Sequence, residues 1–109
     1  MLDQISVVII TRDAAATLAD TLESTRGFAE VVVYDNGSED ATIEIAQSYE
    51  NVSLHQGDFM GFGPTKNHAV SLARNDWVLS LDADEEVSSE LRQFLDQWKP
   101  VSNNCVGVI

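Results

Sequence analysis

The stretch Trp77-Val-Leu-Ser-Leu-Asp-Ala-Asp84 is an apolar segment of strand length that ends in two carboxylates. While a backbone stays extended, the side chains of residues i and i+2 point to the same side, so Asp82 and Asp84 would face one crevice and Ala83 would turn away from it. Mg²⁺ is commonly held by only one or two carboxylates, with water and substrate phosphates as its other ligands. The stretch therefore predicts the end of a buried strand and a Mn²⁺ or Mg²⁺ site that a phosphorylated ligand completes. An acidic loop that only closes the strand is the alternative.

Four further apolar runs recur along the chain, and segments with helical spacing separate the runs. The apolar runs are residues 5–10, 31–34, 52–54 and 106–109. The helical segments are residues 14–25, 41–49, 64–74 and 88–98. Three of the five apolar runs, residues 5–10, 31–34 and 77–81, are apolar at consecutive positions. This pattern is typical of strands that helices cover on both faces. We therefore expect an α/β fold: an open, mostly parallel, Rossmann-like sheet with helices on both faces.

Residues that favour helix ends support this division. Ser38 precedes two acids and predicts an N-cap, Pro64 suits a first helical position, and Ser88 or Ser89 precedes Glu90 at the start of the last helical segment. These positions give three of the four predicted helices a defined beginning.

The charge of the chain limits its partners. The 109 residues carry 18 acids and 6 bases, a formal net charge of −12, which disfavours nucleic acid and anionic membrane surfaces as partners. A phosphorylated ligand would also be repelled, since two like charges 4 Å apart cost about 4 kcal/mol at an effective dielectric constant of about 20. A bridging cation removes this repulsion, which agrees with a metal next to Asp82.

Cysteine usage and the apolar runs bear on the location of the chain. Cys105 is the only cysteine, so the chain forms no internal disulfide. The apolar run near the start is far too short for a signal peptide or a membrane span. A cytoplasmic location is the resulting expectation.

Polar residues follow the predicted strands at the edge where ligands bind in such sheets. They are Thr11, Arg12 and Asp13 after the first strand, Asp35 to Ser38 after the second, the loop of residues 56–66 after the third, and Asp82 and Asp84 after the fourth. Because the carboxyl ends of parallel strands meet at one edge, one crevice is expected to collect all four groups.

Asp35 has two interpretations. It leaves the second strand into Asn36-Gly37, a turn-forming pair. Its carboxylate suits a hydrogen bond from a nucleotide base that carries an N–H, as uracil does at N3. The alternative is that Asp35 only organises the turn.

The segment Gly61-Phe-Gly-Pro-Thr-Lys-Asn67 matches neither the dinucleotide fingerprint nor a Walker A loop. It retains two glycines that lead to a helix N-terminus, with Lys66 one turn inside the helix. Lys66 is therefore an anion-contact candidate, and a solvated lysine is the alternative.

Four motifs carry a resemblance to a known family. They read Ser6-Val-Val-Ile-Ile-Thr-Arg-Asp13, Val31-Val-Val-Tyr-Asp-Asn-Gly-Ser-Glu-Asp-Ala-Thr42, Gly61-Phe-Gly-Pro-Thr-Lys-Asn67 and Trp77-Val-Leu-Ser-Leu-Asp-Ala-Asp-Glu-Glu86. In this order and spacing they resemble the family-2 glycosyltransferases with the GT-A fold. More narrowly, they look like the bacterial lipopolysaccharide-core glucosyltransferase branch.

The resemblance implies a metal-dependent transfer of a sugar from a nucleotide donor, usually with inversion, and a UDP-sugar is the expected donor. It implies a role for each matching residue: Thr11, Arg12 and Asp13 line the base pocket, Asp35 contacts the base, Lys66 approaches the diphosphate, Asp82 reaches the ribose or the metal, and Asp84 ligates the metal. Asn36 stands where many members carry a second Asp or a Ser, so position 36 is given no role.

Family members continue past the fifth strand into an acceptor-binding half that supplies the general base. Residues 1–109 are accordingly expected to be the nucleotide-sugar-binding half, with no catalytic residue assigned and little transfer by the chain alone. The apolar run 106–109 would leave an open edge, which predicts a homodimer through that edge.

Two other classes of function remain as alternatives. One alternative is a non-enzymatic interaction module that keeps the fold. The other is a phosphohydrolase or a receiver-type phosphotransfer domain. The second of these places its aspartate after the first or central strand, but Asp13 is followed by Ala14-Ala15 and not by a second carboxylate.

Overall fold

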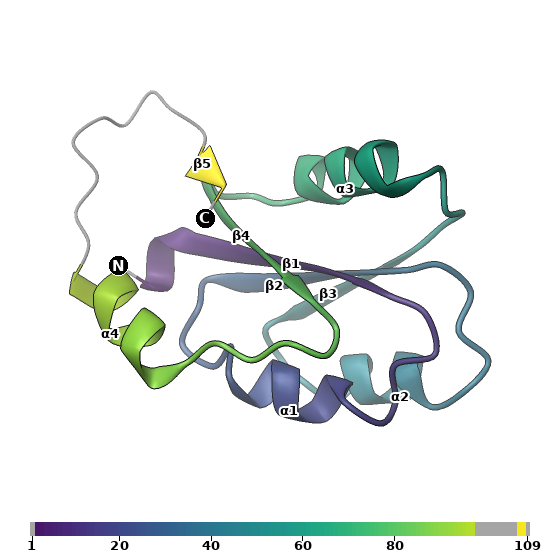
Figure 1. Ribbon diagram of the computed structural model, residues 1–109, viewed down its shortest axis with the longest axis horizontal. Helices are drawn as coiled ribbons and strands as arrows, with labels where there is room; N and C mark the ends of the chain where they lie inside the picture. Colours follow the sequence, from purple (N-terminus) through teal and green to yellow (C-terminus); the bar gives the residue numbers. More distant parts are fainter. Residues whose placement is uncertain (1, 98–106, 109) are drawn as a thin grey trace.

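The computed structural model describes residues 2–97 and 107–108 as five strands, four α-helices and a short 3₁₀ turn (Figure 1). The strands are β1 (Ile5–Thr11), β2 (Glu30–Asp35), β3 (Val52–Gln56), β4 (Trp77–Asp82) and β5 (Gly107–Val108). The helices are α1 (Leu18–Glu23), α2 (Thr42–Gln47), α3 (Phe62–Ser71) and α4 (Ser89–Gln97), and the turn η1 is Leu2–Gln4.

The strands form one sheet in the order β3-β2-β1-β4-β5, and every strand pair is parallel. The chain runs outward from β1 through β2 to β3 and then returns to β4 on the other side of β1. The boundary between β1 and β4 is thus the point where the strand order reverses, which is where open parallel sheets bind ligands. The predicted sheet is confirmed.

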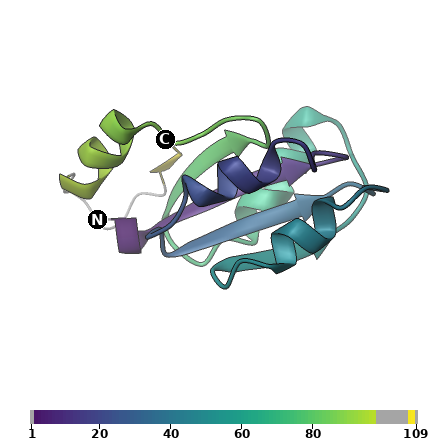
Figure 2. The same ribbon diagram turned by 90° about the horizontal axis from the view of Figure 1, so that it is seen from below.

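Helices cover both faces of the sheet, as predicted. On one face, Val7, Ile9 and Val33 pack in a core with Leu18 of α1 and Ala46 of α2. Figure 1 shows α1 and α2 on this side and α3 on the opposite side, and Figure 2 shows α1 and α2 in front of the strands.

The second core lies under α3. It contains Val8, Val32 and Val78 from three strands and Ala69 from α3. Because alternate residues of β1 enter different cores, nearly every position of this strand is buried, which explains the uninterrupted apolar run in the sequence.

Two helices begin later than the sequence predicts, because the residues before them form other hydrogen bonds. Residues 14–17 form a separate turn, in which Ala14 O accepts hydrogen bonds from the N–H groups of Thr17 and Leu18. Ser38 is not the N-cap of α2, because its hydroxyl bonds to Asp35; Asp40 Oδ1 accepts from Thr42 N instead, at 2.9 Å.

The other two predicted helix starts differ in outcome. Pro64 is the third residue of α3 and not the first, which a helix tolerates because first-turn N–H groups lack an intrahelical acceptor. Ser88 is confirmed as the cap of α4, since its Oγ accepts from Leu91 N at 3.1 Å. Trp98, Val106 and Ile109 lie outside the described residues, and the expected self-association through this edge stays a prediction.

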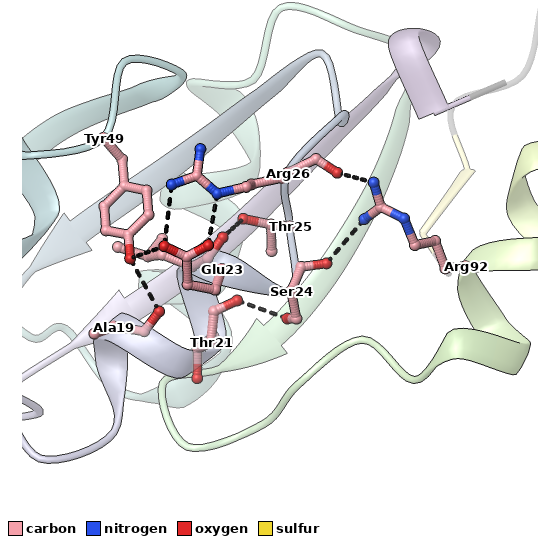
Figure 3. Close-up of polar contacts among 9 residues, drawn as sticks. Ala19, Thr21, Glu23, Ser24, Thr25, Arg26, Tyr49 and Arg92 are labelled. Atoms are coloured by element: carbon pink, nitrogen blue, oxygen red, sulfur yellow. Dashed lines mark hydrogen bonds and ion pairs between the residues drawn. The ribbon is translucent and has the colours of Figure 1, made fainter.

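Polar contacts connect α1 to the end of α2 (Figure 3). Arg26 donates two hydrogen bonds to the carboxylate of Glu23, at 2.6 and 3.0 Å, and Tyr49 OH donates to the same carboxylate at 2.9 Å. The bonds from Arg26 and then Tyr49 lower the pKa of Glu23 to about 2. The Arg26 guanidinium also stacks over the Tyr49 ring at 5.3 Å, so the two helices are joined on their solvent side.

Arg92 of α4 forms hydrogen bonds with the residues that follow α1. Arg92 donates to Ser24 O at 3.2 Å and to Arg26 O. These carbonyls follow the last turn of α1, where no intrahelical donor is left for them. The described residues include no helix that is long and apolar enough to cross a membrane.

A buried carboxylate closes the amino end of the sheet. Glu30, the first residue of β2, accepts hydrogen bonds from Ser6 Oγ of β1 at 2.8 Å and from the backbone N–H of Arg74 at 2.5 Å. Asn75 Nδ2 in turn donates to Ser6 Oγ at 3.0 Å. The Arg74 guanidinium lies 3.5 Å from the carboxylate and its side chain is 79% exposed, so the backbone and hydroxyl bonds carry most of the stabilisation.

We expect Glu30→Ala to lower the free energy of unfolding by about 2–4 kcal/mol, because it leaves two donors without their buried acceptor. Arg74→Ala should cost less than about 1 kcal/mol, since it removes an exposed side chain and keeps the backbone N–H. Urea unfolding followed by circular dichroism measures both values. Equal losses for the two variants would contradict the view that the backbone and hydroxyl bonds to Glu30 stabilise more than the Arg74 guanidinium does.

Candidate functional site

Asp35 ends β2, and its carboxylate organises the turn that follows. Oδ1 accepts hydrogen bonds from Thr11 Oγ1 at 2.7 Å and Ser38 Oγ at 2.6 Å, and Oδ2 accepts from the N–H groups of Gly37 at 3.0 Å and Ser38 at 2.8 Å. The residue is only 1% exposed. The turn-organising role is therefore present, and a base N–H would have to share an oxygen that already accepts two bonds. Contact between Asp35 and a base stays a prediction.

These bonds determine the charge state of Asp35. Burial raises the pKa of its carboxyl, but the hydrogen bonds from Ser38, Thr11 and Gly37 together outweigh burial and leave the pKa below its ordinary value. Asp35 is accordingly an anion at neutral pH.

Asp13 connects the loops after β1 and β2. Its backbone is in the left-handed region, with φ of 51°. Its N–H donates to Ser38 Oγ at 2.8 Å, and its Oδ1 accepts from Glu39 N at 2.7 Å. The Asp13 carboxylate is thus used to shape the edge of the sheet, while the neighbouring Arg12 is exposed.

A second pair of contacts supports the same junction. Ala14 N donates to Thr42 Oγ1 at 2.8 Å, and Ala15 N donates to Asp40 Oδ2 at 3.1 Å. The Thr42 hydroxyl also holds the pKa of Asp40 below its usual value, against the opposing effect of burial. Sequence reasoning missed Ser38, Asp40 and Thr42 in this role, because a hydroxyl or carboxylate before a helix indicates a cap more readily than a contact between loops.

Lys66 and Asp82 lie together at the point where the strand order reverses. They line a hollow of about 360 Å³ with Ile10, Phe59, Phe62 and Gly63. Ile10 of β1 and Asp82 of β4 are register partners in adjacent strands, so the hollow opens between the two strands at their carboxyl ends. The sequence predicted this proximity of a cation and a carboxylate.

Asp35 lines a different hollow, of about 370 Å³, between the carboxyl ends of β2 and β3. Strand alternation explains the separation. Thr11 and Asp35 follow Ile9 and Val33 onto the face covered by α1 and α2, whereas Asp82 is in phase with Val78 on the face covered by α3. The prediction of one crevice for all the candidates is thus not met by Asp35, which lines one hollow while Lys66 and Asp82 line another.

The backbone after Asp82 is not extended, contrary to the premise of the sequence argument. Strand β4 ends at Asp82, and Glu85 N bonds to Asp82 O at 3.0 Å to close a turn. Glu85 Oε1 also accepts from Asp82 N at 2.8 Å. The i, i+2 rule therefore does not orient Asp84, which sits inside this turn and is exposed.

Helix α1 holds the acidic turn in place. Thr17 Oγ1 and Thr21 Oγ1 donate to Ala83 O at 2.8 and 2.9 Å. The turn that carries Asp84 is thus attached to the α1 face of the sheet, while Lys66 is carried by α3 on the other face.

Asp82 and Asp84 are the metal-ligand candidates of the acidic turn, since the Glu85 carboxylate already accepts a hydrogen bond from Asp82 N. In residues 2–97 and 107–108, no group of three or more histidine, cysteine or acidic side chains is placed to hold a metal ion. Asp82 and Asp84 are both exposed and supply hard oxygen ligands, which suit Mg²⁺ or Mn²⁺ when phosphate and water complete the coordination. The residues fit a metal that binds with a phosphorylated ligand better than one held by the protein alone.

We expect Ser38→Ala to lower the free energy of unfolding by about 1.5–3 kcal/mol at pH 7, because a buried carboxylate loses one of its donors. The stabilisation of Asp35⁻ is present above its unfolded pKa of about 3.9 and is lost as pH falls through the depressed folded value. The difference from wild type should therefore shrink below about pH 4. Ser48→Ala, whose hydroxyl donates only to the carbonyl of Ile45 in the same helical turn, is the control, and denaturant unfolding across pH is the measurement. A difference that persists unchanged in acid would contradict the assignment.

Comparisons with known proteins identify the family of this chain. The family described as "Glycosyl transferase family 2" matches residues 6–108. An "Uncharacterized glycosyltransferase" of Rickettsia felis is 36% identical over 96 residues, which are 87% of this chain and 34% of that protein. The "Lipopolysaccharide core biosynthesis glycosyltransferase LpsC" of Rhizobium meliloti is 30% identical over 107 residues, 94% of this chain and 40% of that protein. The chain spans about a third of the length of the curated relatives it matches, and a match across nearly all of its residues shows that it belongs to glycosyl transferase family 2.

Proposed function

We propose that this chain binds a nucleotide-sugar donor, a UDP-sugar, at the carboxyl edge of its sheet for glycosyl transfer. The observation that carries the proposal is the hollow between β1 and β4, where Lys66 and Asp82 lie together. A cation and a carboxylate at the reversal of strand order suit a diphosphate and its divalent ion.

Each candidate residue has a part in this proposal. Lys66 contacts the diphosphate, Asp82 reaches the ribose or the metal, and Asp84 ligates the metal. Thr11, Arg12 and Asp13 line the base pocket, and Asp35 either contacts the base or supports that pocket through its turn. A bound Mn²⁺ or Mg²⁺ would supply positive charge to the departing diphosphate when the bond from the anomeric carbon breaks.

Electrostatics makes the cation necessary for binding. The chain carries a formal net charge of −12, and the Asp82 carboxylate lines the hollow of the proposed site. A single lysine cannot offset this field for a ligand that carries at least two negative charges. The affinity for the donor should accordingly depend on the divalent ion.

We further propose that the whole protein acts in cell-envelope polysaccharide or lipopolysaccharide synthesis in the cytoplasm. The likeness to LpsC supports this, as does the single cysteine, which requires no oxidising compartment. Since the chain spans about a third of its relatives, it would be the donor-binding part, and the acceptor and its general base would belong to the remainder. An interaction module that keeps the fold without the donor is the rival function, and donor binding distinguishes the two.

Calorimetric titration with UDP, GDP and ADP, each with Mn²⁺ and with EDTA, tests the donor and the metal. We expect UDP to bind best and only with Mn²⁺, and Asp84→Asn to weaken its binding about tenfold or more, because the substitution keeps the volume and removes a ligand charge. Asp76→Asn makes the same change of charge at the opposite, amino end of β4 and should leave binding unchanged. UDP binding of equal strength in EDTA would refute the metal role, and absence of binding by all three nucleotides would favour the interaction module.

Lys66→Gln tests the diphosphate contact. We expect UDP binding to weaken about tenfold, which corresponds to about 1.4 kcal/mol, while uridine, which has no phosphate, binds as it does to wild type. Lys66→Arg keeps the charge and should retain most of the UDP affinity. The same calorimetry measures all three proteins, and an equal loss for uridine and UDP would show that Lys66 acts on the base or on the fold and not on the phosphates.

A further inference from the structure

Three apolar side chains are exposed together at the start of α3. Phe59 is 48%, Met60 49% and Phe62 87% exposed, and the two phenylalanine rings meet edge to face with centroids 5.2 Å apart. Among the large hydrophobic residues that the structure describes, Phe94 on α4 is the other exposed one. Three such residues within four positions form a local patch that contributes little to either core.

The loop that presents these rings is well supported. Met60 N donates to Oγ1 of the buried Thr65 at 2.7 Å, and Thr65 N donates to Gly61 O at 3.0 Å. Gly61 has φ of 97°, a left-handed conformation that glycine adopts without strain. The rings are thus held by backbone contacts of their loop and not by burial of the rings themselves.

Both rings line the hollow that contains Lys66 and Asp82. This hollow therefore combines a flat apolar surface, one cation and one carboxylate. A matching ligand carries an anionic group for the lysine, hydroxyl groups for the carboxylate, and a ring with an apolar face for the phenylalanines. The hexose of a nucleotide sugar has all of these features, since it is bonded directly to the diphosphate and presents a face of C–H groups.

We propose that Phe62, supported by Phe59, is the platform on which the donor hexose stacks; this rests on the proposed function. The arrangement of the sheet favours the hexose over the base. Thr11 and Asp35, the candidates for the base, lie in phase with the opposite face of the sheet, whereas Phe62 begins the helix that carries Lys66. Phe62 would accordingly act on affinity for the sugar and not on affinity for the nucleotide.

Calorimetry of the purified chain in Mn²⁺, with UDP, UDP-glucose and UDP-galactose as ligands, tests the assignment. We expect Phe62→Ala to weaken at least one UDP-hexose roughly 3- to 10-fold while UDP binds as to wild type. Phe62→Leu, which stays apolar but lacks the ring, should show a similar loss, and Phe59→Ala a smaller one. Phe94→Ala removes another exposed phenylalanine, from α4, and should change the binding of neither UDP nor the UDP-hexoses.

The outcomes separate this inference from the function on which it rests. Unchanged binding of both UDP-hexoses to Phe62→Ala overturns the stacking role and leaves the proposed function intact. An equal loss for UDP and the UDP-hexoses also overturns it and assigns the rings to the base. Failure of the wild-type chain to bind any of the three ligands refutes the proposed function and the inference together.

Discussion

A hydroxyl–carboxylate hydrogen bond joins β1 to β2 at each end of their pairing. These two bonds fix the register of the strands, on which the candidate site depends. Strand β2 begins with Glu30 and ends with Asp35, and these residues pair in register with Ser6 and Thr11 of β1, whose hydroxyls donate to them at 2.8 and 2.7 Å. A slip of one residue would break both pairs and move every side chain of the strand to the other face. The apolar strand interiors supply most of the burial, and the two carboxylates select one alignment.

The register of β1 and β2 determines the hydrogen bonds between the loops at the carboxyl edge of the sheet. Because Asp35 is fixed against Thr11, its remaining bonds position Gly37 and Ser38, and Ser38 then accepts from Asp13 N. The loops after two adjacent strands thereby become a single hydrogen-bonded unit. On the other side of β1, the pairing of Ile10 with Asp82 places the β4 carboxylate against the hollow that Lys66 shares. The two halves of the edge therefore derive from opposite faces of the same central strand.

The sequence predicted the sheet more accurately than the helix ends. Consecutive apolar residues reveal a strand buried on both faces, so four strands were located within one or two residues of their bounds. The start of α1 was predicted too early because the Ala14 turn, held by Thr42 across the loops, cannot be distinguished from a first helical turn by spacing alone. Ser38 was assigned to a helix because its actual partner, Asp35, is also a turn residue.

Prediction of the candidate site was limited by local backbone geometry and by exposure. The proximity of Lys66 and Asp82 followed from parallel topology, but the turn closed by Glu85 was not evident from a rule that assumes an extended chain. Phe62 had no periodic signal, since an exposed apolar residue between two glycines belongs to neither core. Its position against the hollow depends on the Thr65 contact, which connects residues five apart through a hydroxyl.

The hydrogen bonds from Thr17 and Thr21 to Ala83 O affect how ligand binding would influence local opening of the domain. They attach the acidic turn to α1, while Lys66 belongs to α3 on the opposite layer. A ligand that contacts both Lys66 and the acidic turn would connect the helical layers on the two faces of the sheet. Opening of either layer would then require release of the ligand, so occupancy would slow amide hydrogen exchange in α1 and α3 together, including amides far from the ligand.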